Sequence, residues 1–388
     1  MPMRAEHEAF RDGVRQFVAR EIAPHVDAWD EAGSFPRALY QRAAALGLLG
    51  LGYPEAYGGT PADGWYRLIA TEEIARAGSG GLMASLFSHN IGLPPLVAHA
   101  SEALKRRVIP DVLSGEKIAA LAVTEPSGGS DVARLRCRAR REGDAWVIDG
   151  EKTFITSGLR ADWITLAVRT GLGETQRGAA GISLIAVPGD TPGLSRTPLA
   201  KMGWWCSDTA TLRFDSCRVP HDHLIGTENA GFRMIMENFN DERLLLAAGA
   251  CAFAQVCYNE ALAWARERQT FGSKLVEHQA IRHRLMDMRM RIASTRAWLH
   301  ALVERQERSG AASSDAPPPD WIAELCLLKN HATQTMQWCA DAAVQILGGM
   351  GYMRGTKSER IYREVKVMMI GGGAEEIMKE LAARQLGV

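Results

Sequence analysis

The chain of 388 residues exceeds the usual size of one compact domain, which predicts two or three structural units with a substantial core. Lysine plus arginine and aspartate plus glutamate each number 45, so the sequence lacks the basic excess of proteins that bind nucleic acid or anionic lipid. Seven scattered cysteines, without a Cys-x-x-Cys pair, indicate neither a disulfide framework nor a metal site and favour a reducing compartment. We therefore expect neutral small-molecule chemistry.

Residues 1–117 are expected to form a helical domain. Phe10, Val14, Phe17, Val18 and Ile22 repeat with helical spacing, unlike the charged start and apolar core of a secretory signal. Because neither a signal nor a transit peptide is evident, we expect a cytoplasmic protein. No run of eighteen apolar residues is present, so no membrane span is expected.

The periodicity changes in residues 118–226. In "RLRCRARR", at residues 134–141, Leu135, Cys137 and Ala139 alternate with arginines, which is the pattern of a half-exposed strand. Turn dipeptides, Gly143-Asp144 and Asp149-Gly150, flank "AWVI", and further strand-like stretches follow. This pattern predicts a middle antiparallel β domain of barrel-like form.

Residues 227–388 return to long helical patterns, interrupted by "SGAASSDAPPPD" at residues 309–320, which we expect to be an exposed loop between two helices. A four-helix bundle is the natural packing for such helices. The fold class expected overall is α+β, with helices, then β-strands, then helices. Each interface between the three parts is a candidate ligand site.

Four stretches contain candidate binding residues, although each also has an ordinary structural interpretation. They are "LAVTEPSGGSDVARL" (121–135), "GEKTFITSG" (150–158), "RERQTFGSKLVEHQAI" (266–281) and the C-terminal pair "QILGGMGYMRG" and "MMIGGGAEEIMKE". Glycines permit close approach to a flat or anionic ligand, Phe154 offers a ring face, and Arg268 offers a planar guanidinium for a phosphate. Ordinary turns, a surface strand and solvated helix ends would give the same local patterns.

Taken together, the stretches resemble one family, the FAD-dependent acyl-CoA dehydrogenases, from near residue 5 to residue 388. The matching pieces, in the family's order, are "EAYGGT", "LSGEK", "AVTEPSGGSDV", "DGEKTFITSG", "RERQTFG", "EHQAI", "QILGGMGY" and "GGGAEEIMKE". The resemblance implies a helical N-terminal domain, a β middle domain, a C-terminal helical bundle and a homotetramer. It also implies an acyl-CoA substrate and an electron-transfer flavoprotein as electron acceptor.

The resemblance further implies which residues bind FAD. The flavin would lie against residues of the stretches 121–135 and 150–158 and of the C-terminal turn, namely Leu121, Val123, Thr124, Gly129, Ser130, Phe154, Ile155, Thr156, Ala374 and Glu376. A neighbouring subunit would hold the remainder of FAD through Arg268, Thr270, Phe271, His278, Gln279, Gln345, Ile346, Leu347, Gly348 and Gly349. Many relatives carry Trp at position 154; Phe keeps the apolar face and loses the indole donor. A monomer would have an incomplete site.

The reaction that the resemblance implies removes a proton from the carbon next to a thioester carbonyl while hydride passes from the next carbon to the flavin. This chemistry requires a base of raised pKa and donors to the thioester oxygen. The backbone N–H of Gly372 would be one donor, and the acyl-CoA would also lie near Ser130, Phe239, Asn240, Arg243 and Gly373. Many relatives have the base, a glutamate, at position 372, where this sequence has glycine.

The isovaleryl-type and long-chain-type branches carry the base instead on a core helix, directly before an arginine. "NDERLLLA" matches that arrangement with Glu242 before Arg243. A first-turn acid that favours the helix dipole would explain Glu242 locally, but the glycine at 372 favours its assignment as the base. Asp241 is about 100° round the helix and is expected to point elsewhere, into solvent. Arg243 is expected to pair with a nearby acid or a CoA-side group.

Other functions of the same scaffold are left open by the sequence. A flavin oxidase or monooxygenase would use oxygen as the electron acceptor. A thioester lyase would bind FAD without net oxidation, although retention of Glu242 argues against it. A non-catalytic CoA-binding protein would be colourless or would hold a flavin that no thioester reduces. Acyl chain length and branching are not determined by these motifs.

Overall fold

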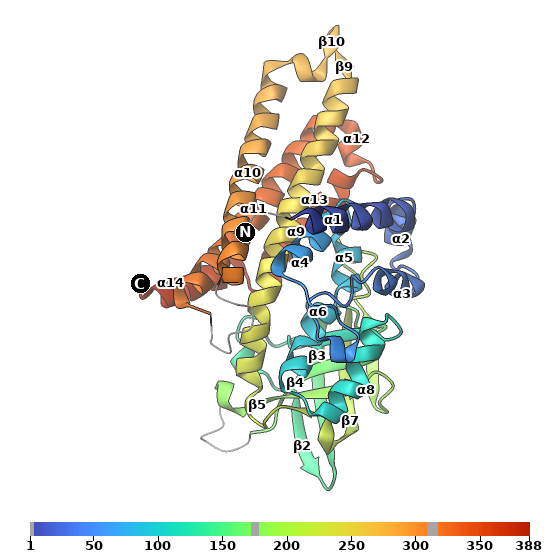
Figure 1. Ribbon diagram of the computed structural model, residues 1–388, viewed down its shortest axis with the longest axis vertical. Helices are drawn as coiled ribbons and strands as arrows, with labels where there is room; N and C mark the ends of the chain where they lie inside the picture. The colour runs from blue at the N-terminus through green and yellow to red at the C-terminus, as the bar shows by residue number, and fades with distance from the viewer. Residues whose placement is uncertain (1–3, 172–177, 309–316) are drawn as a thin grey trace.

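The computed structural model describes residues 4–171, 178–308 and 317–388, with helices at both ends of the chain and β-strands between them (Figure 1). The three-part α+β architecture expected from the sequence is confirmed. All seven cysteines are buried free thiols.

The N-terminal part consists of short helices, several of which begin at side-chain caps. Asp63 accepts hydrogen bonds from the backbone N–H groups of Trp65 and Tyr66, which would otherwise lack partners at a helix start. The helices are α1 (Ala5–Phe17), α2 (Val26–Ala32), α3 (Ala38–Ala45), α4 (Gly64–Ala75), α5 (Gly80–Leu86), α6 (His89–Gly92), α7 (Pro94–His99) and α8 (Glu102–Leu113). The apolar repeat near the N-terminus is confirmed, since α1 and the π-helix Val18–Ile22 bury Val14, Phe17, Val18 and Ile22.

The middle part is a sheet in the strand order β6-β7-β3-β2-β4-β5-β8, with β1 paired to β4. Its strands are β1 (Ala119–Ala122), β2 (Arg138–Glu142), β3 (Ala145–Ile155), β4 (Trp163–Arg169), β5 (Ile182–Pro188), β6 (Leu194–Pro198), β7 (Ala210–Pro220) and β8 (Leu224–Ile225). Most strand pairs are antiparallel as expected, but β1 and β4 pair in parallel from Ala119↔Trp163 to Ala122↔Leu166, which the sequence did not predict. A parallel pair needs a long connection, which here contains the β2–β3 hairpin.

The alternating arginine stretch is a strand only from Arg138 onward. Leu135, Cys137 and Ala139 are buried as the alternation predicted. The N–H groups of Arg136 and Cys137, however, donate to the Glu125 carboxylate at 2.7 and 2.8 Å. A buried carboxylate therefore replaces the neighbouring strand as their partner, and the strand expected at residues 134–137 is absent there.

The C-terminal part is built around α9 (Gly231–Glu267), which packs against α10 (Gln279–Arg308), α11 (Pro319–Leu347) and α13 (Lys357–Ile370). Short elements complete it, namely β9 (Gln269–Thr270), β10 (Ser273–Lys274), α12 (Gly349–Tyr352) and α14 (Glu375–Leu386). The loop expected at 309–320 falls mostly outside the described residues. Its last two residues begin α11 instead, because proline suits the first turn of a helix.

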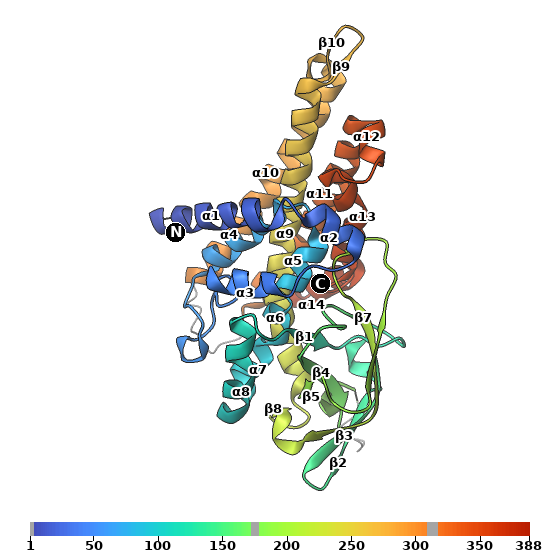
Figure 2. The same ribbon diagram turned by 90° about the vertical axis from the view of Figure 1, so that its right-hand side faces the viewer.

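Helix α9 is the one helix of the described residues that is long and apolar enough to cross a membrane, and 67% of its apolar window is buried in the protein. Its apolar side chains serve the packing of the core. Figures 1 and 2 show that its N-terminal end lies beside the sheet, whereas the β9–β10 hairpin at its other end projects away from the sheet. Helix α9 therefore connects two distant regions of the molecule.

Candidate active site

Glu242 lies on α9 at a position where the side chain is half-buried. Burial raises the pKa of its carboxyl group from 4.5 to about 7, against the opposing effect of the positive charges of Arg243 and Lys329. A carboxyl group with a pKa near neutrality can accept a proton from carbon more effectively than an ordinary carboxylate in water. Its environment therefore suits a general base.

Gly372 lies beside Glu242 although the two are 130 positions apart in the sequence. A Cβ atom at Gly372 would be 3.8 Å from Glu242 Cδ and 3.8 Å from Glu242 Oε1. The same atom would be 2.6 Å from Leu246 Cδ1, a distance that real side chains do not tolerate. Glycine at this position, with φ of +67°, leaves space for the two side chains of α9.

The backbone N–H of Gly372 donates no hydrogen bond to any of the described residues. Its neighbour in the chain, the Gly371 N–H, completes the last turn of α13 by donating to the Val367 carbonyl at 2.7 Å. The Gly372 N–H is therefore available to an acceptor outside the chain, as a donor to a thioester oxygen has to be.

Arg243 is buried and hydrogen-bonds within the protein. Its Nε donates to the Gly372 carbonyl at 3.1 Å, and its Nη1 donates to Asn240 Oδ1 at 3.1 Å. The guanidinium also lies 5.9 Å from the centre of the Phe239 ring. Among the described residues Arg243 therefore donates to a carbonyl of the C-terminal turn and to Asn240 rather than to an acid, and its expected contact with a CoA-side group stays a prediction.

Asp241 points away from Glu242 and forms an ion pair with Arg67 of α4 at 3.1 Å. The expectation that it faces elsewhere is confirmed, but it is not simply solvated. Its partner is 174 positions away in the sequence, so no local pattern could identify it.

Lys329 of α11, which the sequence analysis did not single out, also belongs to this site. Its ammonium donates to the carbonyls of Met369 and Gly373, each at 2.8 Å. The signal that could have found it is a single lysine within the apolar helical stretch "ELCLLKNHAT", whose neighbours Leu325, Cys326, Leu328 and Ala332 are buried.

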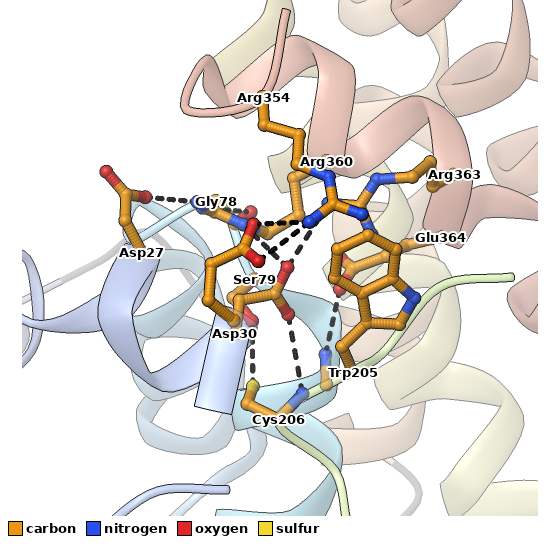
Figure 3. Close-up of polar contacts among 12 residues, drawn as sticks. Asp27, Asp30, Gly78, Ser79, Trp205, Cys206, Arg354, Arg360, Arg363 and Glu364 are labelled. Atoms are coloured by element: carbon orange, nitrogen blue, oxygen red, sulfur yellow. Dashed lines mark hydrogen bonds and ion pairs between the residues drawn. The ribbon is translucent and has the colours of Figure 1, made fainter. Parts of the chain in front are cut away.

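Helix α13, which ends at the Gly371–Gly373 turn, is anchored to the N-terminal helices by a buried polar cluster (Figure 3). Arg363 donates to Asp30 at 3.2 Å, and Arg360 lies 3.5 Å from the same carboxylate. Glu364 accepts from the N–H groups of Gly80 and Gly81 at the start of α5. These contacts fix the position of α13 and therefore of the Gly371–Gly373 turn at its end, which lies beside Glu242.

A buried ion pair joins the stretches 121–135 and 150–158, which contain expected cofactor residues. Lys152 donates to Glu125 Oε1 at 2.8 Å and to the Val123 carbonyl at 2.9 Å. The Thr153 N–H donates to the Thr124 carbonyl at 2.9 Å, which aligns the end of β1 with β3. The motifs "AVTEPSGGSDV" and "DGEKTFITSG" therefore form one continuous surface.

Phe154 lies on that surface in an unusual backbone conformation and with an exposed side chain. Its φ of +60° is unusual for a bulky residue, and its side chain is 69% exposed. Backbone strain combined with an uncovered aromatic ring is typical of a ligand-binding position. Ile155 differs, because its side chain is buried in the sheet core and only its backbone is available to a ligand.

The other residues that are expected near the flavin or the acyl group differ in their exposure to solvent. Gly129 and Ser130 are exposed, and Thr124, Thr156, Ala374 and Gly373 are half-buried. Leu121 and Val123 belong to a core cluster that also contains Ile235 of α9, with Phe239 packed against it. This cluster brings the end of β1 next to the part of α9 that precedes Glu242. Glu376 is exposed in the first turn of α14.

The other expected cofactor residues lie at the opposite end of α9. Arg268 and Phe271 are exposed there, and Phe271 has a φ of +52°. His278 supports the hairpin, since its Nε2 lies 3.2 Å from Thr270 Oγ1 and 3.4 Å from Ser273 Oγ. Gln279 and the end of α11 complete this group, in which Gln345, Gly348 and Gly349 are exposed, whereas the side chains of Ile346 and Leu347 are buried in the core.

The two groups cannot meet within one chain. Glu242 and Glu267 are both on the unbroken helix α9, so a rise of 1.5 Å per residue separates them by about 38 Å. The structure thus brings together Glu242, Gly372 and the β1–β3 surface, but leaves Arg268 and its neighbours far from them.

The residues of both groups fit FAD. An uncovered aromatic ring beside short polar residues suits the isoalloxazine ring, and an exposed arginine together with open glycines suits a pyrophosphate. A Cβ atom at Gly348 or Gly349 would meet no atom within 4 Å, so the backbone there is open to close approach.

Comparisons with known proteins cover nearly the whole chain. Family models for the N-terminal, middle and C-terminal domains of acyl-CoA dehydrogenase match residues 4–116, 120–217 and 229–387. The chain is 34% identical to the mitochondrial long-chain specific acyl-CoA dehydrogenase of Sus scrofa, over 98% of this chain and 86% of that protein. It is also 34% identical to the mitochondrial isovaleryl-CoA dehydrogenase of Oryza sativa subsp. japonica, over 98% of this chain and 90% of that protein.

A crystal structure of a probable acyl CoA dehydrogenase from Mycobacterium abscessus is 44% identical to this chain, with a TM-score of 0.94. The match covers 99% of this chain and 100% of that one. On the strength of the full-length matches, this chain belongs to the acyl-CoA dehydrogenase family, a family of FAD-dependent oxidoreductases.

Proposed function

We propose that the protein dehydrogenates an acyl-CoA thioester to the trans-2-enoyl-CoA, with Glu242 as the base that removes the α-proton. The observation that carries this proposal is the position of the Glu242 carboxyl group, 3.8 Å from the side-chain site of Gly372. The carboxyl group of a base on α9 can thus lie near the place where a side chain at position 372 would put one. The raised pKa of Glu242, about 7, supports the same assignment.

In the proposed reaction, the α-carbon–hydrogen bond breaks, the proton goes to a carboxylate oxygen of Glu242, and the electron pair is delocalised toward the thioester oxygen. The Gly372 N–H donates a hydrogen bond to that oxygen, where negative charge develops. FAD, when bound, supplies the acceptor for the hydride that leaves the β-carbon. Loss of one proton and one hydride leaves the trans double bond of the product.

The surface formed by β1 and β3 is proposed to hold the flavin, with Phe154 against the ring and Ser130 shared between the flavin and the acyl-CoA. Phe239, Asn240 and Gly373 lie beside Glu242 or Gly372 and are proposed to border the acyl group. Arg243 is proposed to act on the substrate indirectly, because its donors are directed to the Gly372 carbonyl and Asn240.

The distance of about 38 Å along α9 between Glu242 and the end of the helix supports a site shared between subunits. We therefore propose a homotetramer in which Arg268, Gln279 and residues 345–349 of one subunit hold the FAD of another. An electron-transfer flavoprotein is proposed to reoxidise the flavin, and the cytoplasm is the proposed location.

Anaerobic titration of the purified holoenzyme with short, long, branched and aromatic acyl-CoAs tests the proposed function. A dehydrogenase loses its oxidised flavin absorbance with at least one of these thioesters and releases the enoyl-CoA. A flavin that no thioester bleaches would contradict the proposal, and rapid reoxidation of the bleached enzyme by air would identify an oxidase instead. Isovaleryl-CoA and a long-chain acyl-CoA are the first compounds to test, since the relatives above are named for these substrates.

A further inference from the structure

Lys329 is a buried cation of α11 that hydrogen-bonds to two carbonyls near Gly372. Its side chain is completely buried, and it forms no ion pair with any carboxylate of the described residues. An ammonium group in the interior is costly unless strong interactions compensate for its lost hydration. Its interactions here are the two hydrogen bonds to the carbonyls of Met369 and Gly373.

These two carbonyls lie on either side of Gly372. The carbonyl of Gly372 itself, which lies between these two in the chain, accepts from Arg243 Nε at 3.1 Å. Two buried cations thus hold three carbonyls within residues 369–373. In a planar peptide group the N–H points opposite to the carbonyl of the preceding residue, so the held carbonyls orient the N–H groups of Ile370, Gly373 and Ala374. The Gly372 N–H belongs to the peptide group of Gly371, which lies between these held groups and is therefore restricted from both sides.

The turn needs such support because its residues are conformationally free. Gly371, Gly372 and Gly373 are consecutive, and Gly372 and Gly373 have φ angles of +67° and +116°. Glycine populates many backbone conformations, so the sequence of this turn does not specify a single one. The constraint comes instead from α11 and α9, through Lys329 and Arg243.

The charges around this turn are unbalanced. Glu242 and Arg243 of α9, Cys326 of α11 and Glu375 of α14 are the titratable groups that act on Lys329. Glu375 is engaged elsewhere, with Lys379 and Gln334 at 2.7 Å each. Ionised Glu242 beside Arg243 and Lys329 leaves an excess of one positive charge, which favours negative charge at the thioester oxygen.

We propose that Lys329 is a positioning residue that fixes the Gly371–Gly373 turn so that the Gly372 N–H meets the thioester oxygen, and that its charge stabilises ionised Glu242. This inference rests on the proposed function. Burial lowers the pKa of Lys329 from 10.5 to about 8, so the ammonium persists at pH 7. A neutral donor could hold the carbonyls, but it could not exert the effect on Glu242.

Two variants separate these roles. Lys329→Met removes both the donors and the charge, and Lys329→Gln removes the charge but keeps a donor. Thr333→Val is the matched control: Thr333 is buried one turn further along α11, and its hydroxyl donates to the carbonyls of Lys329 and Asn330 rather than to the turn. Each holoenzyme is mixed anaerobically with the acyl-CoA that bleaches the wild type, first isovaleryl-CoA, and the flavin reduction rate is followed across pH.

We expect Lys329→Met to reduce the rate by about 10- to 100-fold, somewhat less than loss of an oxyanion donor itself. The acid limb of its pH profile, where the rate falls because Glu242 becomes protonated, should move upward by about one pH unit. Removing a nearby cation raises the pKa of a carboxyl group. Lys329→Gln should recover part of the rate and keep the shifted limb. Thr333→Val should keep both the rate and the limb of the wild type.

A crystal structure of Lys329→Met holoenzyme should show the Gly371–Gly373 turn displaced, whatever the substrate. An unchanged rate and acid limb in Lys329→Met would overturn the proposal. A slower rate with an unmoved limb would overturn the proposed effect of the Lys329 charge on Glu242, and a turn in the wild-type position would overturn the positioning role. Failure of the proposed function is recognised separately, by wild-type flavin that no acyl-CoA bleaches or by full turnover in Glu242→Gln.

Discussion

The carboxyl group of Glu242 lies beside the position where Gly372 would carry a side chain: a Cβ atom there would be 3.8 Å from Glu242 Cδ and 2.6 Å from Leu246 Cδ1. The Glu242 carboxyl group is therefore in van der Waals reach of position 372, whereas Leu246 would overlap a side chain there. The same α9 that supplies the carboxyl group also supplies Leu246, which prevents position 372 from carrying a side chain without movement.

Gly372→Ala should be destabilising. Alanine at a φ of +67° is strained by about 1–3 kcal/mol, and its Cβ would overlap Leu246. Urea unfolding of the holoenzyme measures the loss of stability, and flavin bleaching measures the accompanying loss of rate. Adding Leu246→Ala should restore part of the stability by removing the overlap but not the strain. Equal stability of Gly372→Ala and the wild type would contradict this prediction.

The sequence predicted the order of helices and strands because apolar periodicity is a local property. It did not predict the parallel pairing of β1 with β4 or the loss of strand structure at 134–137, because both depend on partners distant in the sequence. Glu125 is the clearest case: its carboxylate accepts the N–H groups of Arg136 and Cys137, whose side chains alternate as in a strand.

The candidate site was predictable to a similar degree. Glu242 and Gly372 could be paired from the sequence through the family resemblance. The hydrogen bonds from Lys329 to the carbonyls of Met369 and Gly373 could not be predicted, since a lysine in a helix is usually solvated and the packing of α11 against α13 buries this one. Arg67, the partner of Asp241, was missed for the same reason.

The rate of flavin bleaching should depend on pH in the neutral range. The pKa of Glu242 is raised to about 7 by burial, so the base becomes protonated and inactive below that pH. At low substrate concentration the rate constant reports groups of the free enzyme, and it should fall by about tenfold per pH unit below pH 7. Stopped-flow measurements give this profile. An acid limb near 4.5, the ordinary value for glutamate, would show that Glu242 is not the group that titrates.

Phe154→Gly should stabilise the protein without cofactor but weaken FAD binding. Glycine adopts a φ of +60° without strain, which should increase stability by about 1 kcal/mol, while the ring that faces the ligand is lost. Thermal unfolding of the apoprotein and titration with FAD measure the two effects. Phe154→Ala removes the ring and keeps the strain, so it should weaken FAD binding without the gain in stability. Tight FAD binding by both variants would contradict the proposed role of Phe154.

Subunit exchange tests the shared site. Arg268→Glu should impair FAD binding in a neighbouring subunit, and Glu242→Gln should impair proton abstraction in its own. When the two variants are unfolded and reassembled together, random pairing should create sites with both wild-type residues and recover about a quarter of the wild-type activity. Reassembly of each variant alone is the control. A mixture no more active than these controls would mean that Arg268 and Glu242 serve the same subunit's site.

The most direct measurement is anaerobic flavin bleaching by Glu242→Gln, with Asp241→Asn as the matched control on the adjacent residue. Asp241 is ion-paired with Arg67 and should be dispensable for chemistry. We predict that Glu242→Gln retains FAD but is bleached about 10²- to 10⁴-fold more slowly than the wild type, the usual contribution of a general base. Asp241→Asn should bleach at nearly the wild-type rate. Substantial turnover in Glu242→Gln would contradict the assignment of Glu242 as the base.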